Sequence, residues 1–275
     1  MFIGCFATGW FSVILIRLQY YCKEIYKSYR ELNTHLKNSI NTVFFGGAGV
    51  STESNIPDFR SESGLYATRE LYGHSPEELL SYTFFADHPQ LFFRYYKENL
   101  IFADAKPNAA HIALSKLEKA GLLSTVVTQN VDGLHQLAGS LNVVELHGSN
   151  HRQYCIKCGT KYDLRYILNT ENCDGFMPKC KKCGSTVRPD VVLYEEQLDD
   201  SVMRAATLAI KAADCLIVGG TSLVVYPAAG LLRYFSGNKL VLINKGKTPY
   251  DNHADLVINE NIGAVMSDII EQLCL

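Results

Sequence analysis

The segment from Gly46 to Arg60 most constrains what this chain can fold into. It follows residues 41–45, Asn-Thr-Val-Phe-Phe, an apolar run typical of a buried strand, and it opens with Gly-Gly-Ala-Gly. Glycines at a strand end let the backbone turn sharply and approach a phosphate closely, because no Cβ intervenes. A helix opening at Val50 would direct its free N–H groups at such an anion. The segment therefore predicts a phosphate-binding loop.

The continuation of this loop departs from an ordinary dinucleotide-binding helix. Thr52 stands where the G-x-G-x-x-G pattern has its third glycine, so the glycines alone are a weak signature. Pro57 ends the helix early, whereas an average helix runs for about a dozen residues. Residues 58–60, Asp-Phe-Arg, then place an acid, a ring and a cation beside the loop. We expect the segment after the loop to fold over a bound ligand.

Length and charge narrow the classes of function. The 275 residues fit one large domain or a domain with a small insert, and 47% hydrophobic content suits a packed core. The 26 basic and 28 acidic residues give a net charge of −2, so no nucleic-acid surface built on bulk charge is indicated. We therefore expect no direct nucleic-acid partner.

The start of the chain is unusually apolar. Residues 1–16 lack a basic residue before the apolar run and a small-residue cleavage site after it, so they make a poor signal peptide. The run is also shorter than the ~20 residues that a membrane-spanning helix needs. We interpret residues 1–20 as an extension of unknown role and expect no transmembrane span. A membrane-surface anchor is the minor alternative.

Polar residues follow directly after each of several apolar runs. Helix patterns at 108–121 and 200–213 separate these runs, which predicts an α/β fold with a parallel sheet covered by helices on both faces. The carboxyl ends of parallel strands lie along one edge, so the polar residues and the glycine loop should meet in one cleft. These residues are Gln129, Asn130, Val131 and Asp132 after 125–128, His147 after 142–146, Thr221 and Ser222 after 215–218, and Asn244 after 240–243.

Four of the nine cysteines form two C-x-x-C pairs, Cys155 with Cys158 and Cys180 with Cys183. Two such pairs can present four thiolates in a closed tetrahedral site, which predicts one structural Zn²⁺ with no open coordination position. Because the other five cysteines are scattered, the pattern favours a metal site in a reducing compartment, the cytoplasm, over a disulfide scaffold.

Five elements, in this order, resemble the sirtuin family. They are residues 47–51 with 57–60, residues 129–132, His147-Gly148, the four cysteines, and residues 220–222. One departure is Asn55, where the family pattern has glycine; Asn best tolerates a left-handed backbone among the other residues. The resemblance implies a Rossmann-like NAD-binding domain over 21–149 and 190–275, with a helical cofactor-loop segment at 61–106. It also implies a small zinc-ribbon insert at 150–189.

The same resemblance implies NAD-dependent protein-lysine deacylation, with NAD as co-substrate and acylated-lysine proteins or peptides as partners. A neutral imidazole near pH 7 suits proton abstraction from a ribose hydroxyl, so His147 is the predicted catalytic base. His135 belongs to the family pattern but is not expected to be the base, and His111 reads as a packing or capping histidine. The implied cofactor-binding residues are Gly47, Ala48, Gly49, Thr52, Phe59, Arg60, Gln129, Asn130, Val131, Asp132, His147, Thr221, Ser222, Asn244, Lys245 and Ile262.

Substrate recognition is implied for two further stretches. Val192, Leu193 and Tyr194 match the family strand V-x-F-G-E, which pairs with an extended peptide. Tyr194 for Phe and Glu195 for Gly are departures that we expect to alter sequence preference. The family's acid-recognising Y-x-x-R places Phe93 at the tyrosine position and Tyr96 at the arginine position. Arg94 projects about 100° away from Phe93 on a helix, so acetyl and longer neutral acyl groups are the expected substrates.

Two alternatives remain open at this point. One is protein mono-ADP-ribosyl transfer with the same cofactor, against which the intact His147 and the peptide-pairing strand argue. The other is a non-catalytic NAD-sensing or zinc interaction module, against which the complete set of polar motifs argues.

Overall fold

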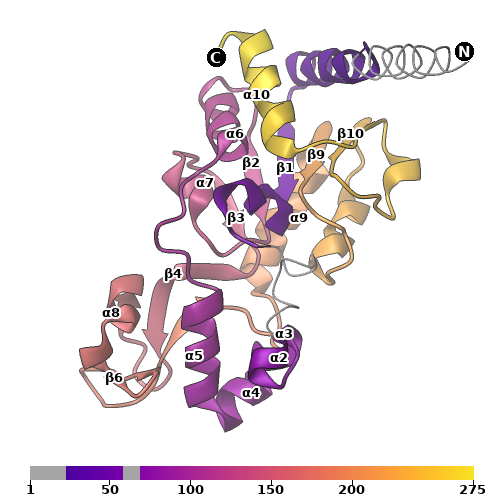
Figure 1. Ribbon diagram of the computed structural model, residues 1–275. Helices are drawn as coiled ribbons and strands as arrows, with labels where there is room; N and C mark the ends of the chain where they lie inside the picture. The colour runs from indigo at the N-terminus through magenta and orange to yellow at the C-terminus, as the bar shows by residue number, and fades with distance from the viewer. Residues whose placement is uncertain (1–22, 58–68) are drawn as a thin grey trace, which may run out of the picture.

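The computed structural model describes residues 23–57 and 69–275. A six-stranded parallel sheet forms the centre of its larger lobe (Figure 1). The strand order is β11-β10-β9-β1-β2-β3, and every neighbouring pair is parallel, which confirms the predicted sheet. The strands are β1 (Thr42–Gly46), β2 (Thr125–Thr128), β3 (Val143–Glu145), β9 (Cys215–Gly219), β10 (Lys239–Ile243) and β11 (Leu256–Ile258).

Helices cover both faces of this sheet. Successive side chains of a strand point to opposite faces, and both sets are apolar here, so both faces must be buried. Phe44 and Ile217 face one core, which includes residues of α6 (Ala109–Lys119) and α10 (Ile262–Leu273). Phe45 and Leu216 face the opposite core, with α9 (Asp200–Ala212) and the 3₁₀ helix η5 (Ala228–Tyr234). Both faces are therefore sealed from water, and only the strand ends are open to a ligand.

The order of the strands reverses beside β1. The chain passes from β1 to β2 on one side and later returns through β9 to the other side. Crossovers that leave in opposite directions open a crevice at the carboxyl ends of the two strands. The loop after β1 and the loop after β9 meet there, since the Gly49 amide donates to the Gly220 carbonyl at 2.8 Å. The glycine loop thus lies at the switch point of the sheet.

The smaller lobe contains the antiparallel sheet β5-β4-β8, formed by β4 (Gly148–Cys155), β5 (Lys161–Asp163) and β8 (Val187–Val191) (Figure 1). Aromatic residues from the helices before β2 share a core with Cys155, Ile167 and Val187 of this lobe. Its helices and short strands are α2 (Arg69–Tyr72), α3 (Pro76–Leu79), α4 (Tyr82–Asp87), α5 (Pro89–Asn99), α8 (Leu164–Leu168), the 3₁₀ helix η4 (Thr170–Asn172), β6 (Cys173–Asp174) and β7 (Met177–Pro178).

A helix over residues 23–37 precedes the first strand. Leu32 and Leu36 enter the same core as α10, and the Asn33 amide donates to Gln272 at 3.1 Å. Residues 1–22 lie outside the described residues, so the proposed extension stays a prediction. Over 23–57 and 69–275, no helix combines the length and the apolar character needed to cross a bilayer.

Candidate active site and metal centre

The glycine loop packs directly against the loop after β9. A Cβ on Gly47 would lie 2.8 Å from Thr221 Cβ, and one on Gly49 would lie 2.8 Å from the Gly220 carbonyl oxygen. Side chains at these two positions would separate the two loops, so glycine is required there. The expected short helix appears as two 3₁₀ turns, η1 (Ala48–Val50) and η2 (Thr52–Ser54). It ends at Asn55 with φ of 61°, which confirms the left-handed backbone expected there.

A single cavity of about 1610 Å³ brings the predicted residues together. Every predicted cofactor or peptide residue within 23–57 and 69–275 lies in its wall, whereas Phe59 and Arg60 lie outside the described residues. The convergence expected from the strand ends is therefore observed, while the role of each residue stays a prediction. The wall includes Gly47, Ala48, Gly49, Thr52, Gln129, Asn130, Val131, Asp132, His147, Val192, Leu193, Tyr194, Thr221, Ser222, Asn244, Lys245 and Ile262.

The imidazole of His147 is oriented by the backbone. Its Nδ1 lies 2.8 Å from the carbonyl oxygen of Gln129, an acceptor only, so Nδ1 carries the proton and Nε2 retains a lone pair. Burial lowers the pKa of His147 below its ordinary value, although the hydrogen bond to Gln129 acts in the opposite direction. The ring is therefore neutral near pH 7, the state that a general base requires.

This pKa predicts the acid side of the pH–rate profile. Because the pKa of His147 lies below 6.5, its basic form persists as the pH falls to that value. We therefore expect the acid limb of kcat/KM for deacylation to have its midpoint below pH 6.5. Measuring kcat/KM against pH tests this, and an acid limb with its midpoint above pH 6.5 would contradict it.

A buried hydrogen-bond network supports the polar residues after β2. Ser51 Oγ donates to Asp132 Oδ2 at 2.7 Å and accepts from Asn130 Nδ2 at 3.0 Å. No role was predicted for Ser51, although the glycine-loop motif contains this serine. The hydroxyl fixes two side chains that line the cavity, so Ser51 belongs to the site.

Two buried histidines lie behind this network, and neither is placed as the base. His111 completes a capping box at the start of α6, which confirms its capping role, and burial lowers its pKa to about 4. Its ring contacts His135, with 4.7 Å between the ring centroids. Burial lowers the pKa of His135 to about 3, and neither ring nitrogen has a hydrogen-bond partner among the described residues. His135 is therefore neutral and inside the core.

The predicted peptide strand is held on one side by the smaller lobe. Tyr194 N donates to the Leu80 carbonyl, and Tyr82 N donates to the Tyr194 carbonyl, both at 3.0 Å. Glu195 has φ of 75°, the backbone region that the family glycine would adopt freely. Its carboxylate accepts hydrogen bonds from Thr83 N at 2.9 Å and from Thr83 Oγ1 at 2.7 Å. The Glu195 side chain thus caps α4.

The expectation that Phe93 takes the acyl-recognising tyrosine position was wrong. Phe93 is fully buried against Phe85 and Phe92, and it does not line the cavity. Helix α5 presents Tyr96 and Asn99 to the cavity instead. The family pattern was therefore placed three residues too early, which is close to one helical turn and keeps the same face.

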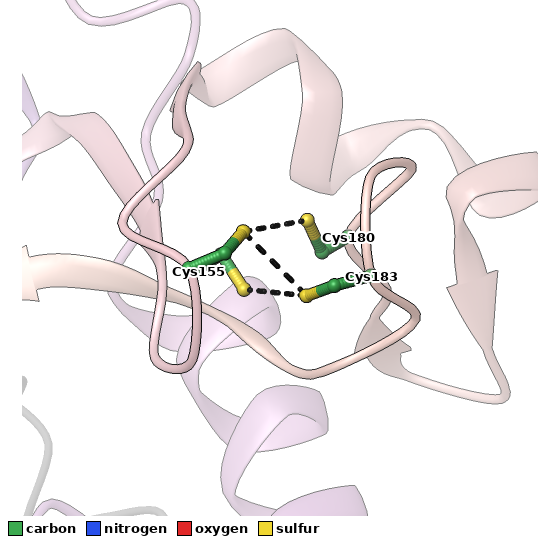
Figure 2. Close-up of side chains that lie close together, drawn as sticks. Cys155, Cys180 and Cys183 are labelled. Carbon is green, nitrogen blue, oxygen red and sulfur yellow. Dashed lines mark hydrogen bonds between the residues drawn. The ribbon is translucent and has the colours of Figure 1, made fainter.

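The four cysteines of the smaller lobe meet at one point. Their sulfur atoms all lie within 4.8 Å of one another, and Figure 2 shows those of Cys155, Cys180 and Cys183 turned towards each other. Cys155 and Cys183 sulfurs are 3.4 Å apart, and those of Cys158 and Cys180 are 3.6 Å apart. A disulfide would bring sulfurs to about 2.05 Å, whereas Zn–S bonds of about 2.3 Å in a tetrahedron separate them by roughly 3.8 Å. The four thiols fit a structural zinc ion.

Both cysteine loops have the same backbone geometry. The Gly159 amide donates to the Cys155 carbonyl at 3.0 Å, and the Gly184 amide donates to the Cys180 carbonyl at 2.8 Å. The two glycines have φ of 68° and 73°, so each knuckle turns through a left-handed residue. This explains how two short spacings present four sulfurs to one centre.

Known proteins are similar to this chain over most of its length. The Sir2 family profile matches residues 47–227. An NAD-dependent protein deacetylase of Clostridium acetobutylicum is 61% identical over 240 residues, which cover 87% of this chain and 97% of the relative. The deacetylase of Clostridium tetani is 57% identical over 244 residues, 89% of this chain and 98% of that relative.

Solved structures of Sir2 proteins are also similar to this chain. Sir2 with a p53 peptide and NAD⁺ has a TM-score of 0.80 at 39% identity, and the match covers 89% of this chain and 98% of that one. A Sir2 variant with a deacetylated p53 peptide and 3′-O-acetyl ADP ribose also has a TM-score of 0.80, at 40% identity over 88% of this chain and 97% of that one. The chain therefore belongs to the Sir2 family.

Proposed function

We propose that the chain is an NAD-dependent protein-lysine deacylase that transfers the acyl group from lysine to ADP-ribose and releases nicotinamide. The observation that carries this proposal is the position of His147, a neutral imidazole oriented by Gln129 in the wall of the cavity. The relatives named NAD-dependent protein deacetylase, and the Sir2 structures with NAD⁺, a peptide and O-acetyl ADP ribose, support the same activity.

The residues of the cavity fit NAD as co-substrate. The glycine loop offers a backbone surface at the switch point of the sheet, where no Cβ at Gly47 or Gly49 obstructs a phosphate. We assign the nicotinamide amide to Asn130 and Asp132, which Ser51 holds in place, and the ribose to Gln129. When bound, NAD supplies the ribose carbon that accepts the acyl oxygen as nicotinamide leaves.

Proton transfer is assigned to Nε2 of His147. The Gln129 carbonyl keeps the proton on Nδ1, so Nε2 is the nitrogen available to take a proton from a ribose hydroxyl. An extended substrate would pair with the segment Val192–Tyr194, which lies in the wall of the same cavity. We assign Phe59 and Arg60 to covering the reaction centre, as their place in the motif implies.

One experiment separates this function from its rivals. The purified protein is incubated with NAD and an acetyl-lysine peptide, and the products are identified by mass spectrometry. We expect nicotinamide, deacetylated peptide and acetyl-ADP-ribose. An ADP-ribose adduct on protein without deacetylation would indicate mono-ADP-ribosyl transfer, and NAD binding without any product would indicate a sensing module.

Two features of organisation also belong to the proposal. We place the protein in the cytoplasm, because the free thiols of Cys155, Cys158, Cys180 and Cys183 require a reducing compartment to hold a metal. We assign residues 150–189 as the zinc-bearing insert and the remaining 21–149 and 190–275 to the NAD-binding part. Residues of the NAD-binding part between Leu79 and Tyr96 share a hydrophobic core with the insert, and Leu80 and Tyr96 also line the cavity.

Acyl selectivity is predicted from the α5 residues that reach the cavity. Tyr96 and Asn99 have the spacing of Y-x-x-R, but asparagine replaces the cation. Arg94 pairs with Glu98 at 3.2 Å on the surface, so it cannot substitute for that cation. Burying a carboxylate without a cation is costly. We expect kcat/KM for a succinyl peptide to be at least ~10-fold below that for the acetyl peptide, a difference of ~1.4 kcal/mol.

The test compares acetyl, butyryl and succinyl versions of one peptide. Cationic residues in the described cavity wall, Arg152, Arg165 and Lys245, come from elements other than α5. Equal turnover of succinyl and acetyl peptides would show that one of these cations, or Arg60, reaches the acyl group. Asn99→Arg should raise succinyl turnover selectively, and Arg94→Met is the matched control that should leave selectivity unchanged.

A further inference from the structure

An ion pair between a buried arginine and a partly buried glutamate joins β8 to the turn after the proposed peptide strand. Arg188 is 5% exposed, and its Nη1 and Nη2 donate to the two carboxylate oxygens of Glu196 at 2.6 and 2.9 Å. A planar guanidinium matches a carboxylate in this two-bond geometry, which a lysine ammonium cannot reproduce. The pair is geometrically fixed, unlike most ion pairs at a protein surface.

Arg188 is also fixed from its other sides. Its guanidinium carbon lies 5.2 Å from the ring centroid of Phe85 and 5.9 Å from that of Tyr154. Nη2 donates to the Val191 carbonyl at 2.9 Å, and Nε donates to the Pro189 carbonyl at 3.3 Å. The side chain therefore ties the end of β8 to the aromatic core of the smaller lobe.

Glu196 passes this constraint to the peptide strand. Its Oε2 accepts a hydrogen bond from Leu193 N at 2.8 Å, and its own amide donates to the Leu193 carbonyl at 3.1 Å. Burial opposes ionisation of Glu196, but the hydrogen bonds from Arg188 and from the Leu193 amide outweigh it, so its pKa lies below the ordinary value. The ionised carboxylate thus closes the turn from Leu193 to Glu196.

The closed turn decides which backbone groups a substrate can reach. Leu193 bonds to Glu196, and Tyr194 bonds to Leu80 and Tyr82 on the side of the smaller lobe. Among the described residues, the N–H of Glu195 and the carbonyl of Val192 have no backbone partner. Both residues line the cavity, so these two groups are available to an extended peptide.

We propose that Arg188 and Glu196 are positioning residues for the peptide strand. They set the affinity for the acylated peptide by holding the turn that leaves Val192 and Glu195 available to it. This inference rests on the proposed deacylase function and on peptide binding at this strand. Neither side chain is assigned a part in the chemistry. Loss of the pair should therefore weaken peptide binding while leaving turnover at saturating peptide and the use of NAD nearly unchanged.

The test uses three variants of the full chain. Arg188→Lys keeps the charge but loses the two-bond fork, and Glu196→Gln keeps an acceptor for Leu193 N. The double variant Arg188→Met with Glu196→Leu removes both polar partners together, which commonly preserves folding because no buried charge is left unpaired. Lys179→Met is the matched control, since it removes a surface ion pair with Asp174 at 3.7 Å in the same lobe.

Four quantities are measured: KM for the acetyl peptide, kcat, KM for NAD, and peptide Kd by calorimetry without NAD. Zinc content and melting temperature report folding. We expect Arg188→Lys and the folded double variant to raise KM and Kd for the peptide ~10-fold, with kcat within ~3-fold and KM for NAD unchanged. Glu196→Gln should weaken peptide binding less than these two variants, because it keeps an acceptor for Leu193 N. Lys179→Met should alter none of the four quantities.

A zinc-loaded double variant with wild-type peptide KM and Kd would overturn the inference. So would variants in which kcat falls while peptide affinity is unchanged. Failure of the proposed function is seen separately, because wild-type protein would then bind the peptide without forming acetyl-ADP-ribose. Peptide Kd still tests the positioning role in that case, since the measurement needs no turnover.

Discussion

His147→Ala is expected to lower kcat for deacylation by at least ~100-fold, the usual contribution of a positioned general base. The imidazole meets the two conditions for that role: it is neutral near pH 7, and Nε2 is its proton acceptor because Nδ1 donates to Gln129. The glycine loop and the residues after β9 do not depend on this ring, so NAD binding should largely persist. Steady-state kinetics with an acetyl peptide and calorimetric titration with NAD measure the two effects.

The control is His253→Ala, which removes a histidine that does not line the cavity. It should leave both turnover and NAD binding at wild-type values. His147→Ala with turnover close to wild type would remove His147 from the mechanism. Equal loss of NAD affinity and turnover would instead assign the ring to binding rather than to proton transfer.

The larger lobe and its cleft followed from local sequence signals. Each strand of the parallel sheet is a short apolar run, and each functional stretch begins where the run ends, as at Gly46 and at Thr128. Such a change from apolar to polar residues is visible without knowing the partners of the strand. The C-x-x-C spacings are equally local, and they predicted the observed cysteine cluster.

The smaller lobe depends on contacts that the sequence pattern does not display. Strand β4 is largely polar and lacks a regular alternation, and it forms through pairing with β8, more than thirty residues later. The family pattern Y-x-x-R placed Phe93 at the tyrosine position, but the sequence does not display which face of α5 reaches the cavity, so this register was misplaced. Ser51 bonds to Asp132, which lies far away in the sequence, and Arg188 meets Glu196 only through the turn after β8, so neither contact is visible in a motif.

Strands β4 and β8 connect the metal centre to the proposed active site. Strand β4 begins directly after His147 and ends at the zinc-site residue Cys155, and β8 continues into the peptide strand. The Val192 amide also donates to the His147 carbonyl at 3.0 Å. The cysteines therefore lie at the far end of the same two strands that position the proposed base and the proposed substrate segment.

Replacing Cys155 or Cys180 by serine is expected to release about one zinc per chain and to unfold or loosen the smaller lobe, because a structural zinc ion supplies folding free energy directly. Both side chains are buried, at 1% and 3% exposure, so a serine there leaves an incomplete ligand set inside the lobe. We expect the melting temperature to fall by ~10 °C or more. Metal analysis by mass spectrometry and thermal unfolding measure the two effects.

Cys274→Ser is the matched control, since this cysteine is exposed and outside the cluster, and it should retain zinc and stability. Deacylation should fall in the Cys155 and Cys180 variants, with the loss appearing in peptide KM as well as kcat because β4 and β8 carry both functions. Wild-type protein that is free of metal yet folded and fully active would contradict the structural role. A variant that loses zinc but keeps wild-type peptide KM would show that β8 holds the substrate segment without help from the metal centre.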